Sequence, residues 1–195
     1  MCRMICATAV LVATVVQPAT ADDTSTCRQE IGDTAIAACT RMLALKPNDP
    51  IPYANRGMNY YIKGDYDRAI ADLDQAIRLE PNFADAYHGR GVVHYGKGDY
   101  ARAIADLDQA TQLNPKNAIA YNQRGFAYNV KGDYAWAISD YDQAIRLNPK
   151  WSVAYFIRAR AYKDKGDYDR NIADLDQAIE LDPKFAAAYN SRGGT

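Results

Sequence analysis

Apolar side chains recur at steps of three and four residues between positions 66 and 77, and they are Tyr66, Ala69, Ile70, Leu73, Ala76 and Ile77. This stripe predicts an amphipathic helix, with Asp65 and Asp67 at its start, where the helix dipole favours negative charge. Pro81 ends the pattern. An earlier face made of Tyr53, Gly57 and Tyr60 predicts a second helix, and Gly64 lies in the turn between them. Because no stretch has the alternation typical of a strand, we expect an all-α chain.

The same two-helix pattern returns with a period of 34 residues. Three sets of residues keep this spacing: Gly64, Gly98, Gly132 and Gly166; Pro81, Pro115, Pro149 and Pro183; Ala76, Ala110, Ala144 and Ala178. Self-similarity at such a period predicts a solenoid, in which each unit packs only on its neighbours. We place the units at 50–83, 84–117, 118–151 and 152–185, with a partial fifth unit at 186–195.

These units resemble the tetratricopeptide repeat (TPR) family. With residue 50 as repeat position 1, the residues that carry the resemblance in the first unit are Tyr53, Gly57, Tyr60, Ala69, Leu73 and Pro81, and most recur in phase in the next three. The resemblance implies a right-handed α-solenoid of helix-turn-helix repeats. It also implies a concave groove lined by the first helix of each unit, and a protein partner.

The N-terminal segment differs from the repeats. Arg3, the short apolar run Ile5–Val16 and the small residues around Ala19 and Ala21 predict a signal peptide over residues 1–21 and an exported protein, periplasmic or secreted. A buried N-terminal helix or a retained anchor is the alternative. Residues 22–49 are interpreted as a degenerate N-terminal repeat or cap, since the segment from Ala35 aligns with the second helix of a unit.

Cys27 and Cys39 are the cysteines that would remain after removal of the leader. Two cysteines in an exported chain usually pair, so we expect a structural disulfide that fixes the degenerate repeat. Two free thiols, with Cys39 as a small core residue, are the alternative.

Composition argues against several kinds of function. The formal net charge is −1 and no basic run occurs, which makes nucleic acid an unfavourable partner. The two histidines, His88 and His94, fall on different helical faces, and His94 takes a tyrosine's place in the repeat. No nucleophile–base pair can be assembled, so we expect no enzyme activity, no metal and no cofactor. No membrane insertion is expected after removal of the leader.

A row of arginines occupies repeat position 7, where the family has leucine: Arg56, Arg90, Arg124, Arg158 and Arg192. The row could line an anion groove. Each unit also carries paired acids such as Asp72 and Asp74, and we favour an Arg–Asp ladder inside the stack. On this interpretation Arg124→Leu would largely preserve the fold.

Positions 5, 9 and 12 vary between units and, by resemblance, tend to face the groove. The predicted partner-binding residues are Met58, Tyr61, His88, Val92, Tyr95, Asn122, Phe126, Asn129, Phe156, Arg160 and Lys163. Met58, Tyr61, Tyr95 and Phe126 predict an exposed apolar patch, and Arg160 and Lys163 predict a basic end. The alternative is that these residues vary without any ligand. Trp136, which stands where other units have arginine, marks a rival convex surface.

The sequence therefore predicts a non-enzymatic scaffold that binds a peptide or helix with apolar and acidic residues in its groove. Self-assembly through the C-terminal end is the alternative.

Overall fold

The computed structural model describes residues 21–194, and within them it contains helices and no strand. The helices are α1 Ala21–Gln29, α2 Asp33–Leu45, α3 Pro50–Ile62, α4 Tyr66–Leu79, α5 Ala84–Gly96, α6 Tyr100–Leu113, α7 Ala118–Val130, α8 Tyr134–Leu147, α9 Ser152–Asp164, α10 Tyr168–Leu181 and α11 Ala186–Gly193. Most of the predicted signal peptide, residues 1–20, lies outside the described residues, and Ala21 begins α1.

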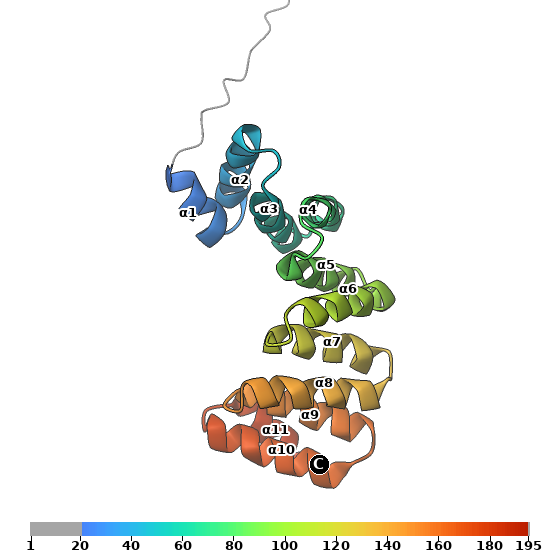
Figure 1. Ribbon diagram of the computed structural model, residues 1–195. Helices are drawn as coiled ribbons and strands as arrows, with labels where there is room; N and C mark the ends of the chain where they lie inside the picture. Colours follow the sequence, from blue (N-terminus) through green and yellow to red (C-terminus); the bar gives the residue numbers. More distant parts are fainter. Residues whose placement is uncertain (1–20, 195) are drawn as a thin grey trace, which may run out of the picture.

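The helices stack in chain order along a curved path, from α1 at one end to α11 at the other (Figure 1). The first helices of successive units contact one another: α1 contacts α3, α3 contacts α5, and α5 contacts α7. The second helices pack mainly on the helices before and after them in the chain. Since the inner side of a curved stack is the shorter one, the first helices form the concave side. The chain is an all-α solenoid, as the period predicted.

The repeated turn explains the repeated Lys-Gly-Asp-Tyr sequence. Gly132, like its counterparts in the other turns, has a positive φ, here 82°, which glycine adopts without steric cost. In three of the four turns the aspartate that follows caps the next helix; the Asp65 carboxylate, for example, accepts a hydrogen bond from the Arg68 backbone N–H at 3.1 Å. A cap of this kind contributes about 1 kcal/mol. The same joint is therefore built from the same residues each time.

Small and branched residues fill the space between helices. Leu73, Leu107 and Leu175 are fully buried at repeat position 24, where unit three has Tyr141. Glycine at position 8 permits close packing against them, because a Cβ on Gly91 would lie 2.8 Å from the Leu107 side chain. The core is thus a chain of similar interfaces rather than one central cluster.

The segment before the first full unit also forms a helix pair. The Asn59 side-chain carbonyl accepts a hydrogen bond from the Gly32 N–H at 2.8 Å, which joins α3 to the start of α2. Cys27 and Cys39 are paired between α1 and α2, with their Cα atoms 4.9 Å apart. This geometry is compatible with the predicted disulfide, whose formation in the exported protein stays a prediction.

Candidate binding surface

The arginines at position 7 form a ladder with aspartates of the second helices. Arg124 donates from Nε and Nη2 to Asp140 of its own unit, at 2.8 and 2.5 Å, and from Nη1 to Asp108 of the preceding unit at 2.7 Å. Arg90 and Arg158 repeat this pattern with Asp106 and Asp74, and with Asp174 and Asp142. Arg56 binds Asp72 and the Thr40 hydroxyl, and Arg192 pairs with Asp176.

The predicted Arg–Asp ladder is therefore confirmed, and the alternative interpretation as an anion-binding groove is wrong. The side chain of Arg124 is 18% exposed and that of Asp140 is 7% exposed, so both charges are mostly removed from water. Arg90, Arg124 and Arg158 also brace successive units, since each guanidinium binds an acid of its own unit and one of the preceding unit. These arginines are engaged by carboxylates and stabilise the stack rather than offering an anion site.

Neither histidine lies in a catalytic or metal-binding arrangement. His94 is buried, with Nε2 3.7 Å from an Asp106 oxygen, and burial lowers its pKa below the ordinary value. Burial likewise lowers the pKa of His88, an effect that Asp85 partly opposes. No cluster of potential metal ligands occurs among residues 21–194.

The predicted groove residues lie on the first helices, but their apolar members are less exposed than the sequence indicated. Met58, Tyr61, Tyr95 and Phe126 are all half-buried. Met58 and Tyr61 pack against the core of units one and two, and Phe126 packs against the buried cluster between units three and four. The patch exists, but each of its side chains also serves as a packing residue.

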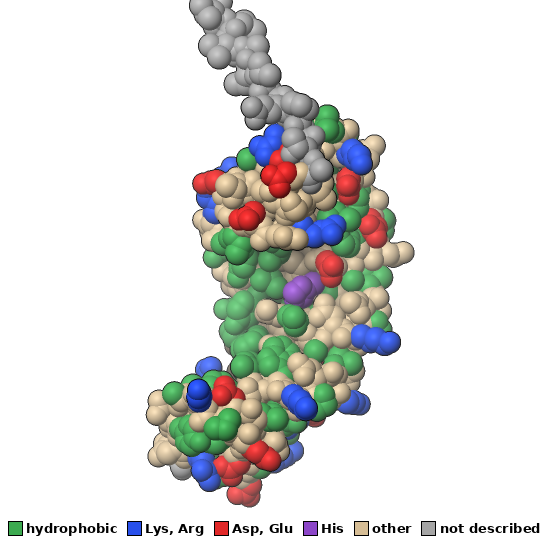
Figure 2. Space-filling model, turned by 90° about the vertical axis from the view of Figure 1, so that its left-hand side faces the viewer, with side chains coloured by type: hydrophobic (Ala, Val, Ile, Leu, Met, Phe, Trp, Pro, Cys, Tyr) green, Lys and Arg blue, Asp and Glu red, His purple; other side chains and the backbone are tan. Residues whose placement is uncertain are grey.

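Aromatic pairing explains this partial burial. The ring centroids of Tyr61 and Tyr66 lie 5.9 Å apart, and those of Tyr95 and Tyr100 lie 5.4 Å apart in an edge-on arrangement. A tyrosine at position 12 therefore contacts the tyrosine at position 17 of its own unit. Hydrophobic side chains gather along the middle of one face, beside a histidine, and charged side chains are more frequent towards its upper and lower ends (Figure 2). The sequence did not predict these contacts, and the groove role of the helix face stays a prediction.

One residue of the predicted basic end, Arg160, affects an aromatic residue two units away. Arg160 on α9 is close enough to Tyr95 on α5 to oppose the rise that burial causes in the pKa of Tyr95. Arg160 and Lys163 are exposed, and nearby the Asn129 side-chain N–H donates to an Asp164 oxygen at 3.2 Å. Arg160 thus interacts electrostatically with Tyr95, although the linear order of the units placed it beyond the aromatic half.

The remaining groove positions are Asn122, His88, Val92 and Phe156. Asn122 is buried and the other three are half-buried. The ring centroids of Phe156 and Phe185 lie 5.0 Å apart, so Phe156 packs against the residue that precedes α11. These residues lie in the predicted row, and their role in binding stays a prediction.

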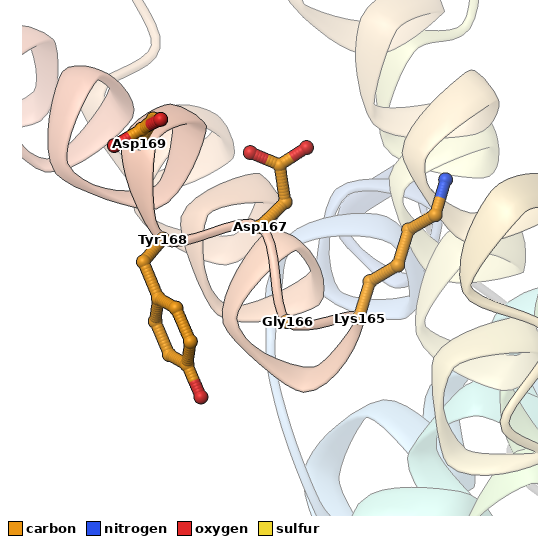
Figure 3. Close-up of a pocket in the computed structure, with 5 residues that line it drawn as sticks. All are labelled: Lys165, Gly166, Asp167, Tyr168 and Asp169. Carbon is orange, nitrogen blue, oxygen red and sulfur yellow. The ribbon is translucent and has the colours of Figure 1, made fainter.

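Shallow hollows beside the turns are products of the repeat. One, of about 370 Å³, is lined by Lys165, Gly166, Asp167, Tyr168 and Asp169 (Figure 3). The Lys165 and Asp167 side chains point to one side of the turn and Tyr168 points to the other. Equivalent hollows occur at the turns of units one and two, which identifies them as features of the joint and not as a special site.

Trp136 is the main exposed aromatic residue on the second helices, with 65% of its surface accessible. Its ring stacks on Tyr128 at 6.2 Å. In units one and four an arginine occupies this position and covers the equivalent tyrosine. The guanidinium carbon of Arg68, for example, lies 4.4 Å from the centroid of the Tyr60 ring. Trp136 therefore performs the packing that arginine performs elsewhere, which weakens its case as a binding residue.

Family models agree with this architecture. The TPR repeat model matches residues 57–98, 95–132 and 159–194, and the tetratricopeptide repeat model matches residues 118–150. The chain belongs to the tetratricopeptide repeat family. No curated protein sequence matches it. No helix within residues 21–194 is both long enough and apolar enough to span a membrane.

Solved structures with the same fold include MamA, which is 30% identical with a TM-score of 0.72 over 80% of this chain and 91% of that chain. MamA from Desulfovibrio magneticus RS-1, beginning at its residue 41, is 22% identical with a TM-score of 0.75, covering 85% of this chain and 93% of that one. YrrB, a TPR protein with an unusual peptide-binding site, is 23% identical with a TM-score of 0.70, covering 82% of each.

Proposed function

We propose that this protein is a non-enzymatic scaffold that binds a segment of another protein along its concave face. The observation that carries the proposal is the contrast between constant joints and a variable concave row. Position 12 changes from Tyr61 and Tyr95 to Asn129 and Lys163, whereas the turn residues recur in every unit. Stacking alone would not require that variation in a solenoid.

The chemistry of the row indicates the partner. Half-buried Tyr61, Tyr95 and Phe126 offer apolar contacts, and exposed Arg160 and Lys163 offer positive charge. A segment with bulky apolar residues and nearby acidic residues matches both features. The fold that the chain shares with YrrB, a protein with a peptide-binding site, supports this class of partner.

Export is part of the proposal. The leader over residues 1–21 would take the chain across a membrane, and an oxidising compartment would keep Cys27 and Cys39 paired. The partner would then be a periplasmic or secreted protein.

Self-association is a second candidate, favoured by exposed apolar residues of unit four and of the segment that follows it. Tyr168, Ile172 and Tyr189 are 56%, 39% and 46% exposed. Size-exclusion chromatography with light scattering of the parent and a Tyr168→Ser/Tyr189→Ser variant tests it. A concentration-dependent oligomer in the parent that is lost in the variant would favour self-assembly.

The scaffold proposal is tested by peptide selection. A random dodecapeptide phage library is panned on the natively exported protein, and selected peptides are photo-cross-linked to proteins carrying benzoylphenylalanine at position 95 or at position 136. Cross-linking at position 95 and not at position 136 supports the concave site. Failure to select any peptide, or cross-linking confined to position 136, would overturn the proposal.

A further inference from the structure

The solenoid has two edges that differ in chemistry. The turns inside the units form the turn edge, and the joints between units form the joint edge. Two of these joints, residues 113–119 between α6 and α7 and residues 147–153 between α8 and α9, lie on the left of the stack in Figure 1. That side faces the viewer in Figure 2, where apolar side chains gather in the middle.

These two joints lack the acids that the joints on either side of them carry. The joint between α4 and α5 contains Glu80 and Asp85, and the joint between α10 and α11 contains Asp182. The residues that correspond to Glu80 and Asp85 are neutral at the middle joints, and they are Asn114, Ile119, Asn148 and Val153. No aspartate or glutamate occurs in residues 109–119 or 143–153.

Basic residues give the middle joints a single sign of charge. Lys116, Arg146 and Lys150 are exposed, and none of them pairs with a carboxylate in the part of the chain that the structure describes. At the turn edge, by contrast, the Lys97 ammonium lies 2.7 Å from an Asp67 oxygen. The formal net charge of the chain is −1, so any attraction for an anionic surface arises from these local cations.

Aliphatic side chains lie in the same joints as the cations. Ile119 is 54% exposed, Val153 is 41% exposed and Leu113 is 36% exposed. Ile119 and Val153 are each the second residue of a helix, where the helix dipole favours an acid such as Asp85 in α5. Helix stability therefore does not explain these residues, and exposed apolar side chains grouped with cations indicate an interaction surface.

Hydrogen bonds hold both joints in a defined conformation. The Asn117 side-chain carbonyl accepts a hydrogen bond from the Ile119 backbone N–H at 3.1 Å, and the Tyr155 hydroxyl donates to the Pro149 carbonyl at 3.3 Å. The cations and the aliphatic side chains are thus presented by ordered backbone. Binding through this edge would therefore require little further ordering of the chain.

A bilayer surface with anionic lipids matches this chemistry better than a protein does. Protein interfaces use complementary charges of both signs and pockets for anchoring side chains. The middle joints carry one sign, and the hollows described above lie at the turn edge. Anionic headgroups attract lysines and arginines near the surface, and apolar side chains beside those cations enter the boundary between headgroups and acyl chains.

We propose that the joint edge of units two to four docks on the surface of a bilayer that contains anionic lipids. The residues that make the contact are Lys116, Ile119, Arg146, Lys150 and Val153. The contact is peripheral, so no helix enters the bilayer. It goes beyond the proposed scaffold function, because it uses none of the predicted groove residues.

The two tryptophans of the chain provide a direct test, because they lie at opposite edges. Trp151 lies in the joint between α8 and α9, and Trp136 is in the first turn of α8, next to the turn edge. Trp136→Phe and Trp151→Phe each leave one fluorescent reporter. With vesicles of phosphatidylglycerol and phosphatidylcholine brominated on its acyl chains, we expect quenching of Trp151 and not of Trp136. Quenching of Trp136 alone would contradict the proposed orientation.

Co-sedimentation with vesicles of the same two lipids, unbrominated, measures the contribution of the lysines. Lys116→Asn/Lys150→Asn introduces the residue that unit one has at this position, Asn82. It should lower the partition coefficient by about 10- to 30-fold, since each lysine near such a surface contributes about a factor of five. Lys131→Asn/Lys165→Asn makes the same charge change at the turn edge and should stay within about 2-fold of the parent.

A second pair of substitutions examines the aliphatic side chains. Ile119→Asp/Val153→Asp introduces the acid that unit two has at this position, Asp85. It should abolish vesicle binding and leave the melting temperature unchanged or higher, because an acid in the first turn favours the helix. Vesicle binding that survives this change would overturn the inference.

The remaining outcomes separate the membrane contact from the groove. Tyr95→Ala should bind vesicles like the parent. Vesicle binding by a protein on which no peptide can be selected would support the edge while the scaffold proposal fails. Absence of parent binding to the anionic vesicles at low ionic strength, or equal losses in the two lysine variants, would overturn the inference. If the parent ignores vesicles and Lys116→Asn/Lys150→Asn loses a selected peptide, the edge belongs to a protein interface and the inference is wrong.

Discussion

Arg124 and Asp140 are joined by two parallel hydrogen bonds, of 2.8 Å from Nε to Oδ2 and 2.5 Å from Nη2 to Oδ1. Burial raises the pKa of Asp140, which Arg124 opposes. The same guanidinium also binds Asp108, so it holds acids on two successive second helices. The pair is thus part of the joint between units two and three.

The first prediction concerns this pair. Arg124→Leu should lower the free energy of unfolding by about 3 kcal/mol, because it leaves the Asp140 carboxylate buried without its partner. This reverses the tolerance expected from the family's leucine. The measurement is urea unfolding followed by circular dichroism.

Two variants serve as comparisons for that measurement. Arg102→Leu removes a solvent-exposed arginine whose pair with Asp99 spans 3.3 Å, and it should change stability by under about 0.5 kcal/mol. Arg124→Leu combined with Asp140→Leu should recover much of the loss. Equal stability of the parent and Arg124→Leu would contradict the bracing role.

A second prediction concerns Gly125 and Tyr141. Gly125→Ala should destabilise the protein by about 1–3 kcal/mol, since the new methyl group would meet the Tyr141 ring at 2.6 Å. Adding Tyr141→Leu should relieve the clash, because unit four already combines Ala159 with Leu175. If the double variant were less stable than Gly125→Ala, the contact would not be the cause.

A third prediction follows from the lowered pKa of His94, which burial causes and Asp106 partly opposes. A histidine with a lowered folded-state pKa takes up its proton more readily when unfolded. Its neutral form therefore favours folding above about pH 6.5, and stability falls as the pH drops below that value. His94→Tyr, the residue of the other three units, should flatten the stability profile between pH 7 and pH 5. An unchanged slope in chemical denaturation across this range would count against the argument.

The N-terminal pair gives a fourth prediction. The natively exported, unreduced protein should contain no thiol that reacts with Ellman's reagent under denaturing conditions, because Cys27 and Cys39 lie in disulfide geometry. Reduction should lower the melting temperature, since the chain-entropy model gives such a short loop roughly 3 kcal/mol. Two titratable thiols before reduction would refute the pairing.

Much of the fold could be predicted because the residues that determine each turn and helix lie close together in the sequence and recur in every repeat. The spacing of Gly64 and Gly98 fixed the turns, and the aspartates beside the arginine row indicated the ladder. The binding surface was harder to predict, because the exposure of a side chain depends on residues that are near in space but not in sequence. The contact between Tyr95 and Tyr100, and the approach of Arg160 to Tyr95, depend on side-chain conformation and curvature, which the repeat period alone does not specify. The hydrogen bond between Gly32 and Asn59 joins an irregular segment to a regular one and had no sequence signal.

Salt provides a fifth prediction, for a peptide selected on the parent. Lys163→Ala should weaken binding by less than Tyr95→Ala does, and the difference from the parent should shrink as ionic strength rises, because Lys163 is an exposed charge at the rim. Titrations at two salt concentrations measure this. A loss that stays constant with salt would contradict an electrostatic role.

The central claim is that the concave face, and not the convex one, binds the partner. Calorimetry of the selected peptide with the parent, Tyr95→Ala and Trp136→Ala tests it most directly, with thermal melts to verify that both variants are folded. The account predicts that Tyr95→Ala loses about 1–3 kcal/mol of binding free energy and that Trp136→Ala binds like the parent. Parent-like binding by Tyr95→Ala together with lost binding by Trp136→Ala would contradict it.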